Sequence, residues 1–281
     1  MPVSATFRIR RPAGAATLVY DTPHSGREYP ADWDTRASRA ELRRGEDACV
    51  DELLAGAPAL GACLLEALVP RCYVDLNRLE TDIDAALLAE PWPTPLTPSE
   101  KTIRGLGLIR RFVVPGVEIN ARALSVAEVR ERIERVYRPY HAALRELVDE
   151  VLAQRGTAWH VNWHSMKSLG NAMTADGPGA KRADFVVSDR EGASAGPQLM
   201  DAIVGTLRSL GYRVSVNDPY KGGTIVQQLG APERGVHSVQ VEINRALYLD
   251  EAVVEKSAQF SALAANLDRL TATLASLAPT R

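Results

Sequence analysis

Short apolar runs alternate along the chain with longer segments in which apolar residues recur every three or four positions. The short runs are rich in valine, tyrosine, isoleucine and tryptophan, and turn residues follow most of them, as is typical of buried strands. The predicted strands are residues 16–21, 71–76, 158–163, 183–188, 212–217 and 236–243.

The longer segments have the apolar spacing of amphipathic helices. The predicted helices are residues 46–60, 125–156, 195–211 and 251–277. At the start of the second helix, Ser125 is followed three positions later by Glu128, a spacing that resembles a capping box, and Gly156 is suited to end it.

Strand and helix patterns alternate over the whole length, which predicts an α/β fold with a mostly parallel mixed sheet and helices on both faces. The sequence contains no internal repeat, and its 281 residues are enough to bury a substantial core. We therefore expect residues 1–281 to form a single catalytic domain.

The segment 91–111 interrupts this alternation. It has four prolines between positions 91 and 98, followed by Gly105 and Gly107. Because prolines there cannot continue a helix or a central strand, the segment is predicted to be a long loop. Two interpretations stay open: a lid over a cleft, or an ordinary surface loop.

The composition is that of an ordinary globular protein, with 46% hydrophobic and 24% charged residues. The 33 basic and 35 acidic side chains leave a formal net charge of -2, and the basic residues are scattered along the chain. Neither nucleic acid nor an anionic membrane surface is therefore indicated as a partner.

Three cysteines, Cys49, Cys63 and Cys72, are an odd number without CxxC spacing. We therefore expect neither a disulfide framework nor a cysteine-rich zinc site. The N-terminal residues lack the apolar core of a signal peptide, and no apolar run approaches the roughly 20 residues that span a bilayer. These features favour a cytoplasmic protein.

Polar residues lie at the ends of several predicted strands, which is where open α/β sheets bind their ligands. His24 follows the first predicted strand in the sequence Pro-His-Ser-Gly, and His164 follows the third. Asn77 and Arg78 follow the second strand, and Glu242 lies late in the last one. Two histidines, a carboxylate and an arginine at neighbouring strand ends indicate one site.

Zinc is the simplest interpretation, because catalytic zinc takes three protein ligands from histidines and carboxylates and lowers the pKa of a bound water to about 7. His24 and His164 are the predicted ligands, with Asp47 as the third. Glu242 is the predicted general base, and Arg78 the predicted contact for an anionic group of the substrate.

Each assignment has a structural alternative. A histidine after a strand is often a hydrogen-bonded loop residue, and Asp47 near a helix start can complement the helix dipole. Arg78 can be a surface cation or a partner of Asp75. Glu242 is harder to explain structurally, because an unpaired carboxylate inside an apolar strand is costly to bury.

Two further patterns are weaker. His160 lies four residues before His164, as in the HExxH zinc motif, but Val161 replaces the required glutamate and the segment is predicted as a strand. Lys221, in the sequence Pro-Tyr-Lys-Gly-Gly, lacks the spacing of a phosphate-binding loop. It is either a second cation for a substrate carboxylate or a solvated side chain.

Seven segments, in this order, resemble the N-formylglutamate amidohydrolase family, and together they cover roughly residues 17–265. They are PHSG (23–26), DACVDELL (47–54), YVDLNR (73–78), YRPYHAAL (137–144), NWHSM (162–166), NDPYKGG (217–223) and GVHSVQVEINRALYLDE (235–251). The family is similar to the zinc carboxypeptidases and aspartoacylases. The resemblance implies a zinc-carboxypeptidase-like (phosphorylase/hydrolase-like) α/β fold, a zinc held by two histidines and a carboxylate, an Asn-Arg pair for the substrate carboxylate, and a glutamate base.

The resemblance places His24 and His164 on the metal, Asn77 with Arg78 on the substrate, and Glu242 as the base. One departure concerns the third ligand. The carboxypeptidase pattern has a carboxylate three residues after the first histidine, where this chain has an arginine. Asp47 is preferred, with Glu28 and Glu46 as alternatives.

The second departure is the segment VEINR (241–245). It differs from the sequence typical of the family members that degrade histidine, so the identity of the substrate stays open. The resulting hypothesis is a metal-dependent hydrolase that cleaves the linear amide of an N-formyl or N-acyl amino acid. Zinc or another divalent transition metal suits the ligands, and Lys221 is a candidate second cation. The alternatives are a zinc carboxypeptidase or amidase acting on peptides or cell-wall fragments, and a non-catalytic binding protein on the same scaffold.

Overall fold

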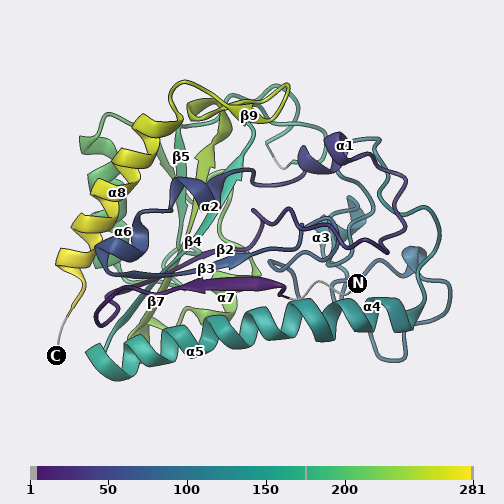
Figure 1. Ribbon diagram of the computed structural model, residues 1–281, viewed down its shortest axis with the longest axis horizontal. Coiled ribbons are helices and arrows are strands. Elements are labelled where there is room, and N and C mark those ends of the chain that lie inside the picture. Colours follow the sequence, from purple (N-terminus) through teal and green to yellow (C-terminus); the bar gives the residue numbers. More distant parts are fainter. Residues whose placement is uncertain (1–4, 175, 280–281) are drawn as a thin grey trace.

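A seven-stranded mixed sheet lies at the centre of the computed structural model, which describes residues 5–174 and 176–279 (Figure 1). Across the sheet the strands are β1 (Phe7–Arg10), β3 (Ala62–Ala67), β2 (Leu18–Thr22), β4 (Ala158–Met166), β7 (Val236–Asn244), β5 (Phe185–Ser188) and β6 (Val214–Val216). Strands β3, β2, β4 and β7 are parallel neighbours, and β5 is parallel to β6. Only β1 against β3 and β5 against β7 run antiparallel in the described sheet, so the predicted mostly parallel mixed sheet is confirmed.

Helices cover both faces of this sheet, as predicted. The helices are α1 (Arg39–Arg43), α2 (Val50–Leu53), α3 (Glu100–Ile103), α4 (Val126–Arg132), α5 (Arg138–Arg155), α6 (Pro197–Ser209), α7 (Thr224–Leu229) and α8 (Phe260–Leu277). Helices α4, α5 and α7 pack on one apolar core, and α2, α6 and α8 pack on the other. Among the described residues, no helix is both long and apolar enough to cross a membrane.

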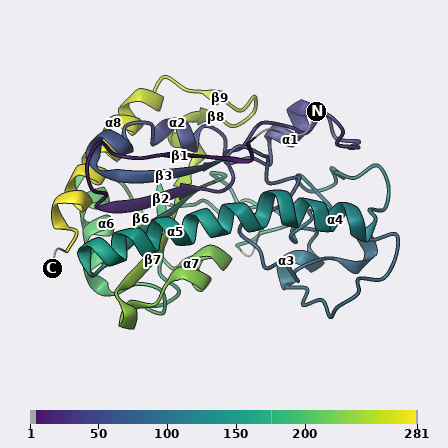
Figure 2. The ribbon, with the colours of Figure 1, turned by 60° about the horizontal axis from the view of Figure 1, so that its bottom comes forward.

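The predicted helix 125–156 forms one nearly continuous rod that runs across one face of the sheet (Figure 2). Ser125 and Glu128 make the expected reciprocal capping box, and Gly156 ends the rod with a φ of 79°. A π-helical turn at Ile133–Tyr137 joins α4 to α5. The predicted helix 195–211 is also confirmed, as α6.

The predicted strand 71–76 is wrong. The chain leaves the sheet after Ala67, and residues 71–76 form turns and irregular backbone in which the Asp75 amide donates to the Leu108 carbonyl oxygen over 2.8 Å. The position next to β2 is occupied by β3, which lies between β1 and β2 and whose alanine- and leucine-rich sequence does not distinguish a strand from a helix.

Two predicted helices are shorter than expected. The segment 46–60 contains only α2 and a 3₁₀ turn at Ala57–Leu60, because Gly56 and Pro58 prevent a continuous helix. The segment 251–277 is helical only in α8. Its first residues belong to a small hairpin of β8 (Leu249–Asp250) and β9 (Glu255–Lys256).

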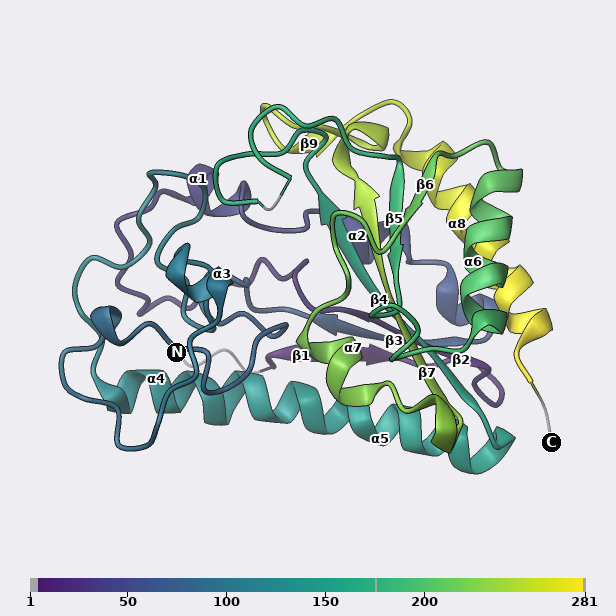
Figure 3. The ribbon, with the colours of Figure 1, turned by 180° about the vertical axis from the view of Figure 1, so that it is seen from behind.

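The segment 91–111 is a long connection with one short helix, α3, among its described residues. In the ribbon views α1, α3 and α4 lie together on one side of the molecule, and α6 and α8 lie on the opposite side (Figures 1 and 3). Leu108 and Ile109 anchor the end of the segment in the core beneath the rod. The prolines at its start therefore do not make it a detached surface loop.

Candidate active site

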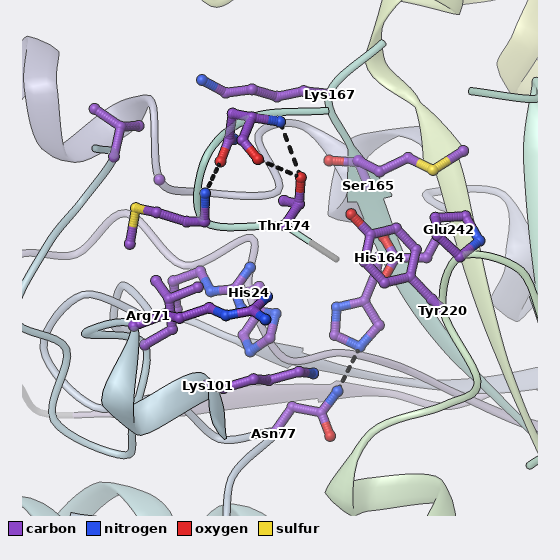
Figure 4. Close-up of a pocket in the computed structure, with 18 of the residues that line it drawn as sticks. His24, Arg71, Asn77, Lys101, His164, Ser165, Lys167, Thr174, Tyr220 and Glu242 are labelled. Carbon is purple, nitrogen blue, oxygen red and sulfur yellow. Dashed lines mark hydrogen bonds between the residues drawn. The ribbon is translucent and has the colours of Figure 1, made fainter. Parts of the chain in front are cut away.

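A pocket of about 410 Å³ opens where the carboxyl ends of β2, β4 and β7 meet (Figure 4). His24, His164 and Glu242 reach it from these three strands. Among the described residues that line it are seven arginines and three lysines, against two glutamates. The pocket is therefore strongly cationic although the whole chain has a net charge of -2, which suits an anionic small molecule.

His24 lies directly after β2 and is almost fully buried. Its Nε2 is 2.7 Å from Asp75 Oδ1, and since a carboxylate only accepts, the ring proton lies on Nε2. The following Pro-His-Ser-Gly turn needs its glycine, because a side chain at Gly26 would overlap the carbonyl group of Val69. Burial, assisted by the charge of Arg71, lowers the pKa of His24 and keeps the ring neutral at pH 7.

His164 and Glu242 are register partners in the parallel pair β4–β7 and therefore stand side by side on one face of the sheet. His164 Nε2 is 2.7 Å from Asn162 Oδ1, and the Asn162 amide nitrogen donates in turn to Asp21 over 2.7 Å. This chain of contacts puts the ring proton on Nε2 and turns Nδ1 toward Asp47, whose Oδ2 is 3.0 Å away. In this tautomer the Asn77 amide nitrogen, 3.1 Å from Nε2, is a neighbour and not a hydrogen-bond donor to it.

Asp47 lies in the turn before α2, with one oxygen facing both histidines and the other held by arginines. Its Oδ2 is 3.4 Å from His24 Nδ1, while Oδ1 accepts hydrogen bonds from Arg71 over 3.3 Å and Arg245 over 3.1 Å. Burial acts to raise the pKa of Asp47, but the charge of Arg71 and the contacts with both histidines hold it well below its usual value.

The donor atoms of His24, Asp47 and His164 lie within 4.8 Å of one another. His24 Nδ1 is buried and makes no hydrogen bond. With the ring protons on Nε2, two nitrogen lone pairs and a carboxylate oxygen face one point. These three electron-rich atoms repel one another unless a cation lies between them. The set fits a divalent transition metal, and each histidine has the outer hydrogen bond that metal-binding histidines make.

The other carboxylates considered for this cluster lie elsewhere. Glu28 is exposed at the surface. Glu46 is buried, but its carboxylate contacts the Tyr29 hydroxyl and accepts from Arg43 over 3.1 Å. Asp47 is the carboxylate that the structure brings together with the two histidines.

Glu242 borders the pocket with one polar neighbour on its own strand. Gln240 donates from its amide nitrogen to Glu242 Oε1 over 2.9 Å. Burial raises the pKa of Glu242, and the charge of Asp47 adds to this, whereas His164 opposes it. A carboxyl group with a raised pKa beside the cluster is suited to accept and return a proton.

Asn77 and Arg78 are both buried at the pocket. The Asn77 backbone amide donates to Asp75 Oδ1 over 3.0 Å, and the Arg78 guanidinium forms no ion pair with any described residue. The Asn77 amide nitrogen is 3.1 Å from His164 Nε2, and a side chain at Gly223 would overlap the Asn77 amide. Arg78 donates from Nε to the Leu106 carbonyl oxygen over 2.7 Å and from Nη1 to that of Asn77 over 2.6 Å. The guanidinium is thus fixed by neutral groups and keeps its charge available.

Lys221 differs from this pattern. Its side chain is 62% exposed at the rim, and its ammonium group pairs with Glu191 over 2.8 Å. His160 is buried below the pocket, where it contacts Asp21 and Ser238 over 3.0 and 2.7 Å. The structure therefore groups His24, Asp47, His164, Glu242, Asn77 and Arg78, and leaves Lys221 at the edge.

Comparisons with known proteins agree with this arrangement. The sequence model of the N-formylglutamate amidohydrolase family matches residues 16–249. The N-formylglutamate deformylase of Pseudomonas putida is 30% identical over 240 residues, which cover 85% of this chain and 84% of that protein. The chain belongs to the N-formylglutamate amidohydrolase family. The resemblance found in the seven sequence segments is thereby confirmed, and with it the assignment to a family of hydrolases.

Two further members of the N-formylglutamate amidohydrolase family extend the comparison. The deformylase of Pseudomonas aeruginosa is 31% identical over 242 residues, covering 85% of this chain and 84% of that protein. The crystal structure of N-formylglutamate amidohydrolase from Ralstonia eutropha JMP134 is 43% identical, with a TM-score of 0.91 over 98% of each chain.

Four residues of the site do not follow from the sequence patterns: Arg71, Asp75, Lys101 and Arg110. Arg71 lies just before the family segment YVDLNR and Asp75 lies within it. Charged residues in an otherwise apolar run are the signal by which these two could be found. Lys101 and Arg110 lie in the segment 91–111, whose path over the pocket has no local signature.

Proposed function

We propose that the protein is a metal-dependent hydrolase that cleaves the linear amide of N-formylglutamate or of a closely related N-acyl acidic amino acid. The observation that carries this proposal is the convergence of His24, Asp47 and His164 beside Glu242 in a strongly cationic pocket. Family membership supports amide hydrolysis, and the names of the relatives support N-formylglutamate as the substrate.

His24 and His164 would hold the metal through Nδ1, and Asp47 through Oδ2. A divalent metal bound there supplies a Lewis acid that activates water and polarises the acyl carbonyl group. Asp75 and Asn162 fix the histidine rings by accepting their Nε2 protons, while Arg71 and Arg245 keep Asp47 ionised. Zinc suits this donor set, as do manganese and iron.

Glu242 would move the proton. It accepts a proton from the attacking water as the new carbon–oxygen bond forms, and it returns that proton to the amide nitrogen as the carbon–nitrogen bond breaks. The products are the free acid, formate for a formyl substrate, and the amino acid with its amine restored. The raised pKa of Glu242 brings its proton affinity closer to those of the attacking water and the leaving amide nitrogen.

Arg78 and Asn77 would hold a carboxylate of the substrate. Arg78 is fixed by two carbonyl oxygens and has no carboxylate partner among the described residues, so an incoming carboxylate meets an oriented cation. A substrate held there is adjacent to His164 through the Asn77 amide. We expect the scissile amide of a short amino acid bound there to lie near the cluster.

The test combines metal analysis with a hydrolysis assay on protein that carries no histidine tag. We expect about one divalent metal per chain by inductively coupled plasma mass spectrometry and release of formate from N-formylglutamate that a chelator abolishes. H164A should lose the metal. H141A is the matched control, because His141 contacts the Leu76 carbonyl oxygen outside the cluster. Full activity of metal-free protein would contradict the proposal, and cleavage of dipeptides alone would favour a peptidase.

A further inference from the structure

The pocket contains cations that no protein carboxylate neutralises. Lys101 and Arg110 both line it, and neither forms an ion pair with any of the described residues. Other cations at the same pocket are paired: Arg71 with Asp47 and Asp75, and Arg245 with Asp47. Arg44, Arg78 and Lys167 have no ion-pair partner among the described residues either. Lys101 and Arg110 differ from them in lying on the segment 91–111, which covers the site from one side.

Arg110 has the least explained environment. It is 6% exposed, and its Nε atom is buried without a hydrogen-bond partner. Burial, together with the charge of Arg71, lowers the pKa of Arg110 to about 10. Because an unpaired charge is costly to bury, a guanidinium kept in this position indicates an anionic partner that comes from outside the protein.

Lys101 extends from α3 into the pocket, with its ammonium group toward Asn77 and His164 (Figure 4). Lys101 is an exposed residue, and its ammonium group faces other cations. The charge of Arg78, with burial, lowers the pKa of Lys101 to about 7. An anion placed among these side chains would therefore relieve repulsion that the protein alone leaves uncompensated.

The charges of the proposed substrate match this arrangement. N-formylglutamate has two carboxylates, and Asn77 with Arg78 accounts for one of them. Lys221, the candidate from the sequence for the second, is engaged by Glu191 at the rim. We infer that Lys101 and Arg110 form a subsite for a second carboxylate, so that the segment 91–111 selects dicarboxylic N-acyl amino acids. The inference rests on the proposed function for the identity of the substrate.

The test separates binding from turnover. Isothermal calorimetry on the metal-loaded enzyme compares glutarate, a five-carbon dianion, with butyrate, a monoanion of similar length. We expect K101M and R110M each to weaken glutarate binding by about 10- to 100-fold, the effect of losing one charged hydrogen bond. Butyrate binding should change less than two-fold. K221M is the matched control and should keep the preference for glutarate.

A parallel assay compares kcat/KM for N-formylglutamate and N-formylnorvaline, which lacks the second carboxylate. K101M should lower the first and spare the second. The inference is overturned if the wild type shows no preference for glutarate, or if the preference survives both substitutions. If the wild type hydrolyses neither compound but K101M still removes the glutarate preference, the proposed function fails while the dicarboxylate subsite is supported.

Discussion

Glu242 is the carboxyl group that stands beside the histidine cluster in register across two strands. Replacing it by glutamine keeps the shape and the contact with Gln240 but removes the proton acceptor. We expect E242Q to lower kcat by about 10² to 10⁴ while the metal content stays unchanged. Formate release and mass spectrometry measure the two effects separately.

The control for this variant is E100Q, since Glu100 is an exposed glutamate that lines the same pocket. Its activity should stay within two-fold of the wild type. An E242Q enzyme with wild-type kcat would exclude Glu242 as the base, and one that lost its metal would show a structural role instead.

Lys101 gives substrate binding a pH dependence near neutrality. Arg78 and Arg71 lower its pKa and Asp75 and Glu242 raise it, with the result about 7. A bound carboxylate raises this pKa, so binding takes up a proton at pH values above 7. Glutarate affinity should therefore be full below pH 7 and fall as pH rises, by at most ten-fold per pH unit. Inhibition constants between pH 6 and 9 measure this slope.

K101M should flatten that profile, because methionine does not titrate. The same slope in K101M and in the wild type would show that another group controls binding. A slope of opposite sign would show that binding releases a proton, which a cation with a lowered pKa does not do.

At the scale of elements, the two central strands β4 and β7 carry a polar ladder on one face. His160, Asn162 and His164 stand opposite Ser238, Gln240 and Glu242 in parallel register. The alternate residues of both strands are apolar and belong to the core shared with α6 and α8. One parallel register therefore aligns the cluster, its outer contacts and the proposed base.

The ladder predicts that Asn162 sets the metal affinity without touching the metal. N162A removes the acceptor of the His164 Nε2 proton, and such outer contacts are worth about 10- to 100-fold in metal affinity. Competition with a chromophoric chelator measures the loss, and the melting temperature reports any general destabilisation. S238A is the control, because Ser238 pairs with His160, two residue pairs along the same face of the strands from His164. It should bind metal nearly as the wild type does. Equal losses in both variants would indicate a general effect on the sheet.

The sequence predicts the part of the site that strands position. Apolar runs mark the strands before His24 and around His164 and Glu242, and parallel strands bring their ends to one edge. The segment 71–76 has the same apolar pattern but leaves the sheet, because Arg71 and Asp75 are held by the cluster instead of by a strand partner. Local pattern does not separate these two cases.

At the scale of the whole molecule, the segment 91–111 is placed by long-range packing. The Leu108 amide donates to the Asp82 carbonyl oxygen over 2.8 Å, and α3 lies on the side of the molecule away from α6 and α8 (Figure 3). A proline-rich run without periodicity contains no information about such contacts. Its role in the site is therefore found only from the folded chain.

The same geometry predicts that the substrate fastens this segment to the sheet. A dicarboxylate would join Arg78, which is held beside Asn77 on the sheet side of the pocket, to Lys101 and Arg110 of the segment 91–111. Since two uncompensated cations face the space, the segment is less firmly held when the anion is absent. We therefore predict that the segment acts as a lid whose closure is driven by charge neutralisation.

Hydrogen exchange followed by mass spectrometry tests this closure. With glutarate bound to the metal-loaded enzyme, peptides covering 98–111 should exchange about ten-fold more slowly, a change that corresponds to roughly 1.4 kcal/mol in opening free energy. Butyrate should give little protection, because it reaches only one group of cations. Peptides from α8, on the far side of the sheet, serve as the internal control. Equal protection by both acids, or protection that persists in K101M, would show that the segment closes without the second carboxylate.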